Sequence, residues 1–117
     1  MSQTKLSVRL RFHDQARLGP GKVALLESVL STGSVAAAGA SQDMSARRAW
    51  LLIDSLNKAF DQPVVVTNDE SAGDTVEATL TPLGKQIIQA YRAVEADTRE
   101  SVSARFADLI GHLKPEV

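Results

Sequence analysis

The chain has no cysteine, and only 2 of its 117 residues are histidine. The missing cysteine excludes disulfides, thiolate nucleophiles, thiolate-bound zinc and iron–sulfur clusters. The two histidines, His13 and His112, stand far apart in the sequence, which disfavours a histidine-rich metal site. No apolar run approaches the roughly 18 residues that a membrane span needs. These absences predict a cytoplasmic protein with no metal, no cofactor and no contact with a membrane.

The composition is that of a globular protein with an uneven distribution of charge. Hydrophobic residues make up 44% of the chain and charged residues 23%, and a chain of this length usually forms one domain. The formal net charge is −1, but residues 1–60 carry eight Lys or Arg against four Asp or Glu, and residues 61–117 carry five against ten. The basic half can face a polyanion while the acidic half stays solvated.

The first half of the chain predicts one strand and three helices. Apolar side chains at every second position predict a half-buried strand over residues 5–13. Pro20 can begin a helix, and Gly33 can end it in the left-handed conformation. Two further helices are then expected over residues 35–40 and 46–60.

The connection between these last two helices has a characteristic length. Ser34 and Ser45 are plausible N-caps, and residues 42–44 form the turn between the helices. A helix of about seven residues, a short turn and a helix of about fifteen residues indicate a helix-turn-helix.

The second half predicts a hairpin and one long helix. Short strands at residues 64–66 and 78–80, with a polar loop between them, would form a wing beside the helix-turn-helix. Thr81 and Pro82 then begin a helix of about 30 residues, or some 45 Å. Its apolar residues recur at spacings of three and four, so its outer half is expected to pair with a second copy.

Arg47 and Arg48 are the most informative polar residues. They stand in the first turn of the third helix, where the helix dipole disfavours a cation by about 0.3 to 1 kcal/mol. Contact with phosphates or base edges in a DNA major groove would account for them. Ser34 can likewise contact a phosphate or act only as an N-cap, and Leu51 can meet a thymine methyl group or pack against another element.

The other candidate residues and motifs are better explained by ordinary structural roles. Trp50 lies beside the apolar stripe of the third helix, which favours packing over base stacking. The acidic residues between 69 and 77 lack the spacing of a calcium loop. No nucleophile stands beside a general base in a recognisable context, so an enzyme is not expected and there is no catalytic residue to name.

Four segments together resemble a known family. Residues 17–27, 32–34, 44–52 and 80–84 are similar to the amino-terminal DNA-binding domain of ModE, the molybdate-responsive transcriptional regulator, itself similar to the winged helix of LysR-type regulators. The resemblance covers about residues 6 to 95. It implies a dimeric winged helix-turn-helix regulator whose third helix reads DNA.

Carried over by position, the resemblance places Ser45, Arg47 and Arg48 against DNA and Ser34 near its backbone. The chain departs from the family in having Asp43 in the turn, where glycine is common, and Ala46 before the arginines, where an aromatic residue is common. The expected wing, residues 67–71, is also acidic. The family's molybdate-binding domains have no counterpart before the chain ends at residue 117, so direct molybdate binding is not expected.

These observations predict an α+β, mainly α, fold: a winged helix-turn-helix DNA-binding domain over residues 1–80 and a dimerisation helix over residues 81–114. The predicted function is a bacterial transcriptional regulator that binds double-stranded operator DNA as a homodimer. The alternative is a protein-interaction module that has lost strong DNA binding and modulates a longer regulator. The predicted DNA-binding residues are Ser34, Ser45, Ala46, Arg47, Arg48 and Leu51. The predicted dimerisation residues are Ile87, Tyr91, Val94, Val102, Phe106 and Leu109.

Overall fold

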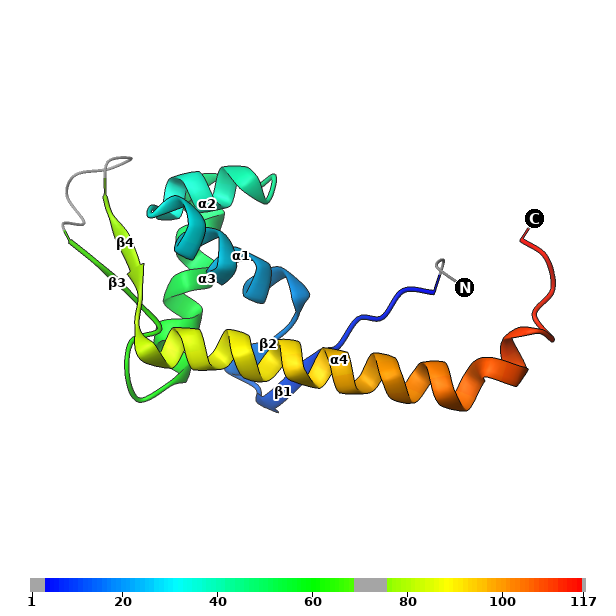
Figure 1. Ribbon diagram of the computed structural model, residues 1–117. Helices are drawn as coiled ribbons and strands as arrows, with labels where there is room; N and C mark the ends of the chain where they lie inside the picture. The colour runs from blue at the N-terminus through cyan, green and yellow to red at the C-terminus, as the bar shows by residue number, and fades with distance from the viewer. Residues whose placement is uncertain (1–3, 69–75, 117) are drawn as a thin grey trace.

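The computed structural model describes residues 4–68 and 76–116. Its elements, in chain order, are β1 (Leu10–His13), β2 (Ala16–Leu18), α1 (Pro20–Thr32), α2 (Val35–Ser41), α3 (Ala46–Ala59), β3 (Val65–Thr67), β4 (Ala78–Leu80) and α4 (Pro82–Ile110). The helices α1, α2 and α3 pack together above the first half of α4, and the second half of α4 extends away from them (Figure 1).

The strands form two separate antiparallel pairs, β1 with β2 and β3 with β4. This corrects the predicted fold class, which was a mainly α winged helix-turn-helix with a long dimerisation helix. The structure is an α+β protein with four helices and two small antiparallel sheets. The single strand expected over residues 5–13 is shorter, and the chain reverses at residues 14–15 to pair Leu10 with Leu18. The amino-terminal strand therefore belongs to a sheet of its own, which the winged helix-turn-helix prediction did not include.

The predicted helix boundaries are largely confirmed because their capping residues act as expected. Ser34, Ser45 and Thr81 each accept a hydrogen bond through the side-chain oxygen from the backbone N–H three residues later, at 3.0, 3.1 and 3.1 Å. Gly33 ends α1 with a φ of 79°, in the left-handed region that glycine adopts without strain. Asp43, between α2 and α3, has a φ of 57°, so the turn keeps its left-handed residue without glycine.

The core lies where α1, α2 and α3 meet the two sheets and the first half of α4. Its largest fully buried side chains are Tyr91, Leu25, Leu26, Ile53, Leu56, Val23, Val29, Val35 and Val64. Trp50 packs against this core, as the sequence predicted. Phe12, which the alternation placed on the buried face of the first strand, is instead 63% exposed.

Two contacts of α4 fix it against the rest of the chain. The hydroxyl of Tyr91 donates a hydrogen bond to the backbone oxygen of Val8 at 2.6 Å, which anchors the amino-terminal segment. Arg92 donates to both carboxylate oxygens of Glu27 in α1, at 3.0 and 2.5 Å, and also to Glu95. The hydrogen bond from Arg92 lowers the pKa of Glu27, because it stabilises the charged carboxylate.

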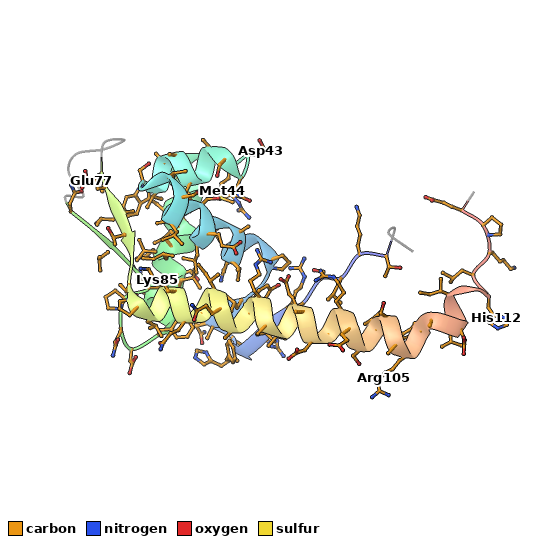
Figure 2. The ribbon with its side chains drawn as sticks, in the orientation of Figure 1. Asp43, Met44, Glu77, Lys85, Arg105 and His112 are labelled. Carbon is orange, nitrogen blue, oxygen red and sulfur yellow. The ribbon has the colours of Figure 1, made fainter. Side chains whose placement is uncertain are left out.

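The two halves of α4 have different environments. Ile87 and Tyr91 are buried in the chain's own core, although the sequence assigned them to a dimer interface. Val94, Phe106 and Leu109 are 40%, 49% and 55% exposed. Arg105 and His112 project from the part of the chain that lies beyond the other helices (Figure 2).

The division into residues 1–80 and 81–114 stays a prediction. Within the described residues, no helix is both long enough and apolar enough to cross a membrane.

Candidate anion-binding site

An open cavity of about 550 Å³ lies between the β1–β2 hairpin, the start of α1 and the start of α3. Its cationic lining residues are Arg9, Arg11, Arg17, Lys22 and Arg48. The other lining residues are Leu10, Leu18, Gly19, Pro20, Gly21, Met44 and Leu52, so none of the lining residues is acidic. A concave surface with apolar walls and charges of one sign concentrates its field on a counter-ion, here an anion.

The hairpin brings like charges together in this cavity. Arg11 and Arg17 are Cα partners across the antiparallel pair, and like charges at directly opposite positions destabilise a sheet. Arg11 lies 3.7 Å from Asp14, but both side chains are more than two-thirds exposed, so this ion pair contributes little. The hairpin therefore contains a repulsion that a bound anion would relieve.

Lys22 adds a third cation at the start of α1. Its ammonium donates a hydrogen bond to the backbone oxygen of Arg17 at 3.1 Å, which holds it at the cavity wall. Partial burial, followed by repulsion from Arg17, lowers the pKa of Lys22 below its ordinary value. The α1 N-cap, Gly19, has no side chain to satisfy the helix, so the positive end of the helix dipole faces the same region.

The paired arginines of α3 separate into different surroundings. Arg48 lines the basic cavity, whereas Arg47 lines a second hollow of about 540 Å³ together with Trp50, Leu51 and Asp54. Among the described residues, Arg48 forms no ion pair. An anion bound in this cavity would offset the unfavourable position of Arg48 in the first turn of α3.

The remaining predicted site residues do not line this cavity. Ser34 and Ser45 are the N-caps of α2 and α3, and Ala46 is the first residue of α3. Leu51 is 60% exposed, so it is not packed into the core. The roles in DNA binding and dimerisation that the sequence assigned to these residues and to α4 stay predictions.

Sequence reasoning missed most of the cavity. Arg9, Arg11 and Arg17 were visible only as polar residues within or near an expected strand. The useful signal was the pair of turn-forming residues Asp14 and Gln15 between two arginine-bearing segments, which could have predicted the hairpin. The described residues contain no cluster of three or more potential metal ligands.

Comparison with known proteins identifies two relatives whose names refer to molybdenum. The chain is 35% identical over 91 residues to the molybdenum-pterin-binding protein MopB of Rhodobacter capsulatus, covering 76% of this chain and 33% of MopB. It is 30% identical over 87 residues to the molybdenum transport protein ModE of Azotobacter vinelandii, covering 73% of this chain and 31% of ModE. The chain is a homologue of MopB and ModE. It spans about a third of the length of each, and no family model matches it.

These homologues confirm the resemblance to ModE and correct the predicted function. Their names describe molybdenum–pterin binding and molybdenum transport. They do not describe a DNA-binding regulator or an interaction module, so neither functional prediction is supported. The expectation that the chain does not bind molybdate directly is also contradicted, because a homologue is named for binding a molybdenum compound. Double-stranded DNA and a second copy of the chain are not shown as partners.

Proposed function

We propose that this ModE-like chain is a molybdenum-binding protein, not an enzyme, that holds an anionic molybdenum compound in the basic cavity. The observation that carries the proposal is the set of five cationic side chains around a cavity whose lining has no carboxylate. Molybdate, a tetrahedral dianion, is the simplest such ligand. The names of the two homologues point to molybdenum as the element, and the cationic side chains of the cavity would attract its anionic compound.

The charges around the cavity are suited to such an anion. Among the described residues, Arg9, Arg17, Lys22 and Arg48 form no ion pair. Guanidinium groups offer paired N–H donors to oxyanions, and a hydrogen bond to a charged group contributes about 1.5 to 3 kcal/mol. These values are already net of the hydrogen bonds to water that are exchanged, so two or three such contacts would favour binding of a dianion at this open site.

The test is equilibrium dialysis with molybdate, with the bound molybdenum measured by mass spectrometry in a buffer free of phosphate and sulfate. The wild-type chain should bind molybdate, and Arg17→Gln and Arg48→Gln should each weaken binding about tenfold, as expected for loss of about 1.4 kcal/mol. Sulfate and phosphate in competition measure how far the cavity selects molybdenum over other oxyanions.

Arg105→Gln is the matched control, since Arg105 lies on the exposed half of α4, away from the cavity (Figure 2). It removes the same charge from the chain and should leave molybdate binding unchanged. If Arg105→Gln weakens binding as much as Arg17→Gln, the effect comes from net charge and the cavity is not the site. If the wild-type chain retains no molybdenum at millimolar molybdate, the proposed function is wrong.

A further inference from the structure

Lys22 differs from the other cations of the basic cavity because its side chain can act as a nucleophile. A guanidinium keeps its proton at every physiological pH, whereas an ammonium that loses a proton becomes an amine with a free lone pair. Of the five lysines in the chain, Lys22 is the one that lines the basic cavity. The cavity therefore places one amine beside several fixed positive charges.

Three features of its surroundings favour the uncharged form of Lys22. Burial first, and repulsion from Arg17 second, lower the pKa of its ammonium. Lys22 is also the third residue of α1, whose first turn has no acidic residue, and the helix dipole disfavours a cation there. Its hydrogen bond to the backbone oxygen of Arg17, at 3.1 Å, does not require the charge, because an uncharged amine still donates an N–H and keeps its lone pair. Among the described residues, Lys22 forms no ion pair that would hold its proton.

Lys58 has the opposite environment within the same chain. Its ammonium lies 2.8 Å from Asp54, and the hydrogen bond to this carboxylate raises the pKa of Lys58. Lys85 and Lys114 are exposed, and neither lines the basic cavity. These three lysines are internal references against which the reactivity of Lys22 can be measured.

The charges around Lys22 determine which reagent would reach its amine. A cavity lined by cations concentrates anions, and Arg17 and Arg48 can bind a phosphoryl group through paired N–H donors. An acyl phosphate carries its reactive carbonyl directly on such a group. With the phosphoryl end held by the guanidinium groups, the carbonyl carbon would lie within reach of an amine on the same cavity wall, and such positioning accelerates a reaction.

We propose that Lys22 is a modification site whose amine takes an acyl group from acyl phosphates bound in the basic cavity. The nitrogen lone pair of Lys22 forms a bond to the carbonyl carbon, and the bond from that carbon to the bridging oxygen breaks. Inorganic phosphate leaves with the electron pair of the broken bond and takes up the proton that the amine releases. The product is a neutral amide, so the cavity loses one cation and holds anions less tightly. This inference rests on the proposed anion site and adds its regulation.

The experiment measures the acetylation rate of each lysine when the intact chain is incubated with acetyl phosphate, with peptides quantified by mass spectrometry. Lys22 should react about tenfold faster than Lys58, Lys85 or Lys114. Acetic anhydride is an uncharged donor of the same acetyl group and gains nothing from the cations. Its preference for Lys22 should therefore be about fivefold smaller.

Competition and substitution test whether the cavity directs the reaction. Sulfate should protect Lys22, because it occupies the same cations, and sodium chloride at equal ionic strength should protect it less. Arg48→Gln should slow acetylation of Lys22 by acetyl phosphate about fivefold and leave the rate at Lys85 unchanged. Arg105→Gln, the matched control on the exposed half of α4, should change neither rate.

Calorimetric titration with inorganic phosphate tests the consequence of the modification. Lys22→Gln, which removes the charge as acylation does, should weaken phosphate binding about threefold to tenfold. Lys85→Gln removes the same charge away from the cavity and should leave phosphate binding unchanged. Unchanged phosphate binding in Lys22→Gln would reject the regulatory effect.

The remaining outcomes separate this inference from the proposed function. Equal rates at Lys22 and Lys85, an equal preference with the two acetyl donors, or no protection by sulfate would overturn the modification site. Molybdate binding together with such a result would leave the proposed function standing. Sulfate protection and dependence on Arg48 in a chain that binds no molybdate would support the modification site and reject the proposed function.

Discussion

Replacing Arg17 by glutamine should make the protein more stable while it weakens anion binding. Arg17 lies directly opposite Arg11 in the β1–β2 hairpin, and both line the basic cavity. Glutamine keeps most of the side-chain length and removes the charge. Lys22 would keep its hydrogen bond, because its acceptor is the backbone oxygen of residue 17.

The size of this effect follows from the cross-strand pair. Like charges at opposite positions cost about 0.2 to 1 kcal/mol, and the lower half of that range applies here because both side chains are exposed. We therefore expect Arg17→Gln to gain about 0.5 kcal/mol in the free energy of unfolding. For a domain of this size the corresponding rise in Tm is about 2 to 3 °C.

Thermal unfolding followed by circular dichroism measures this gain, in a buffer without oxyanions, at low ionic strength and at about 1 M salt. Because the Debye length falls to about 3 Å at 1 M salt, the difference from wild type should shrink there. Adding molybdate should raise the Tm of the wild-type chain more than that of Arg17→Gln. A variant that is less stable than wild type at low salt would refute the argument, because it would show that Arg17 stabilises the free hairpin.

Three further predictions concern the packing of α4. Gly84→Ala should cost about 2 kcal/mol in urea unfolding, since an added Cβ would lie 2.5 Å from the backbone oxygen of Val64; wild-type stability would contradict the close approach of α4 to Val64, the residue before β3. Tyr91→Phe should cost about 1 kcal/mol and speed hydrogen exchange in the amino-terminal segment, because the hydrogen bond to Val8 is lost; unchanged exchange would show that this bond does not anchor the segment. Glu27→Gln should cost about 0.5 kcal/mol at pH 7, a small value because Glu27 and Arg92 are both more than a third exposed. The Glu27 pKa is lowered by folding, so its contribution is present above the unfolded pKa near 4.3 and is lost as the pH falls through the folded pKa; a difference from wild type that persists at pH 2 would contradict this ion pair.

The helices were predictable from the sequence because each one carries its own boundary signals. Ser34, Ser45 and Thr81 cap three helices through contacts only three residues away, and Gly33 ends α1 through its own backbone conformation. Such local interactions depend little on the rest of the fold. The position of β4 was also predicted correctly, since it follows a loop and immediately precedes a capped helix.

The amino-terminal sheet was harder to predict because its strands are very short. β2 has three residues, too few for an alternating pattern to be visible, and it pairs with β1 through an irregular register near His13. The exposure of Phe12 has the same origin. A regular strand would have turned Phe12 toward the same face as Leu10, but the register shifts between Arg11 and His13.

The candidate site was only partly predictable because its cations come from separate parts of the chain: the β1–β2 hairpin and the residue before it, α1 and α3. The sequence drew attention to Arg48 through its conflict with the helix dipole, which is a local argument. The grouping of Arg48 with Arg17 and Lys22 depends on how α3 packs against the hairpin and α1, which is a tertiary property. The sequence explained Arg48 as a residue that contacts a DNA groove. The packing of α3 against the hairpin and α1 shows in addition that Arg48 lines a cavity.

The free energies involved explain how a protein can keep such a repulsive site. The like-charge pair of Arg11 and Arg17 costs at most about 1 kcal/mol without a ligand, a modest fraction of the 5 to 15 kcal/mol that is typical of a folded domain. A ligand present at 100 times its Kd stabilises the folded state by about 2.7 kcal/mol, which more than offsets that repulsion. Because Arg17 belongs to the hairpin and Arg48 to α3, an anion held between them would also link these two elements. Anion binding should therefore protect the hairpin from hydrogen exchange more than it protects the distant half of α4, and equal protection of both would show that the anion binds elsewhere.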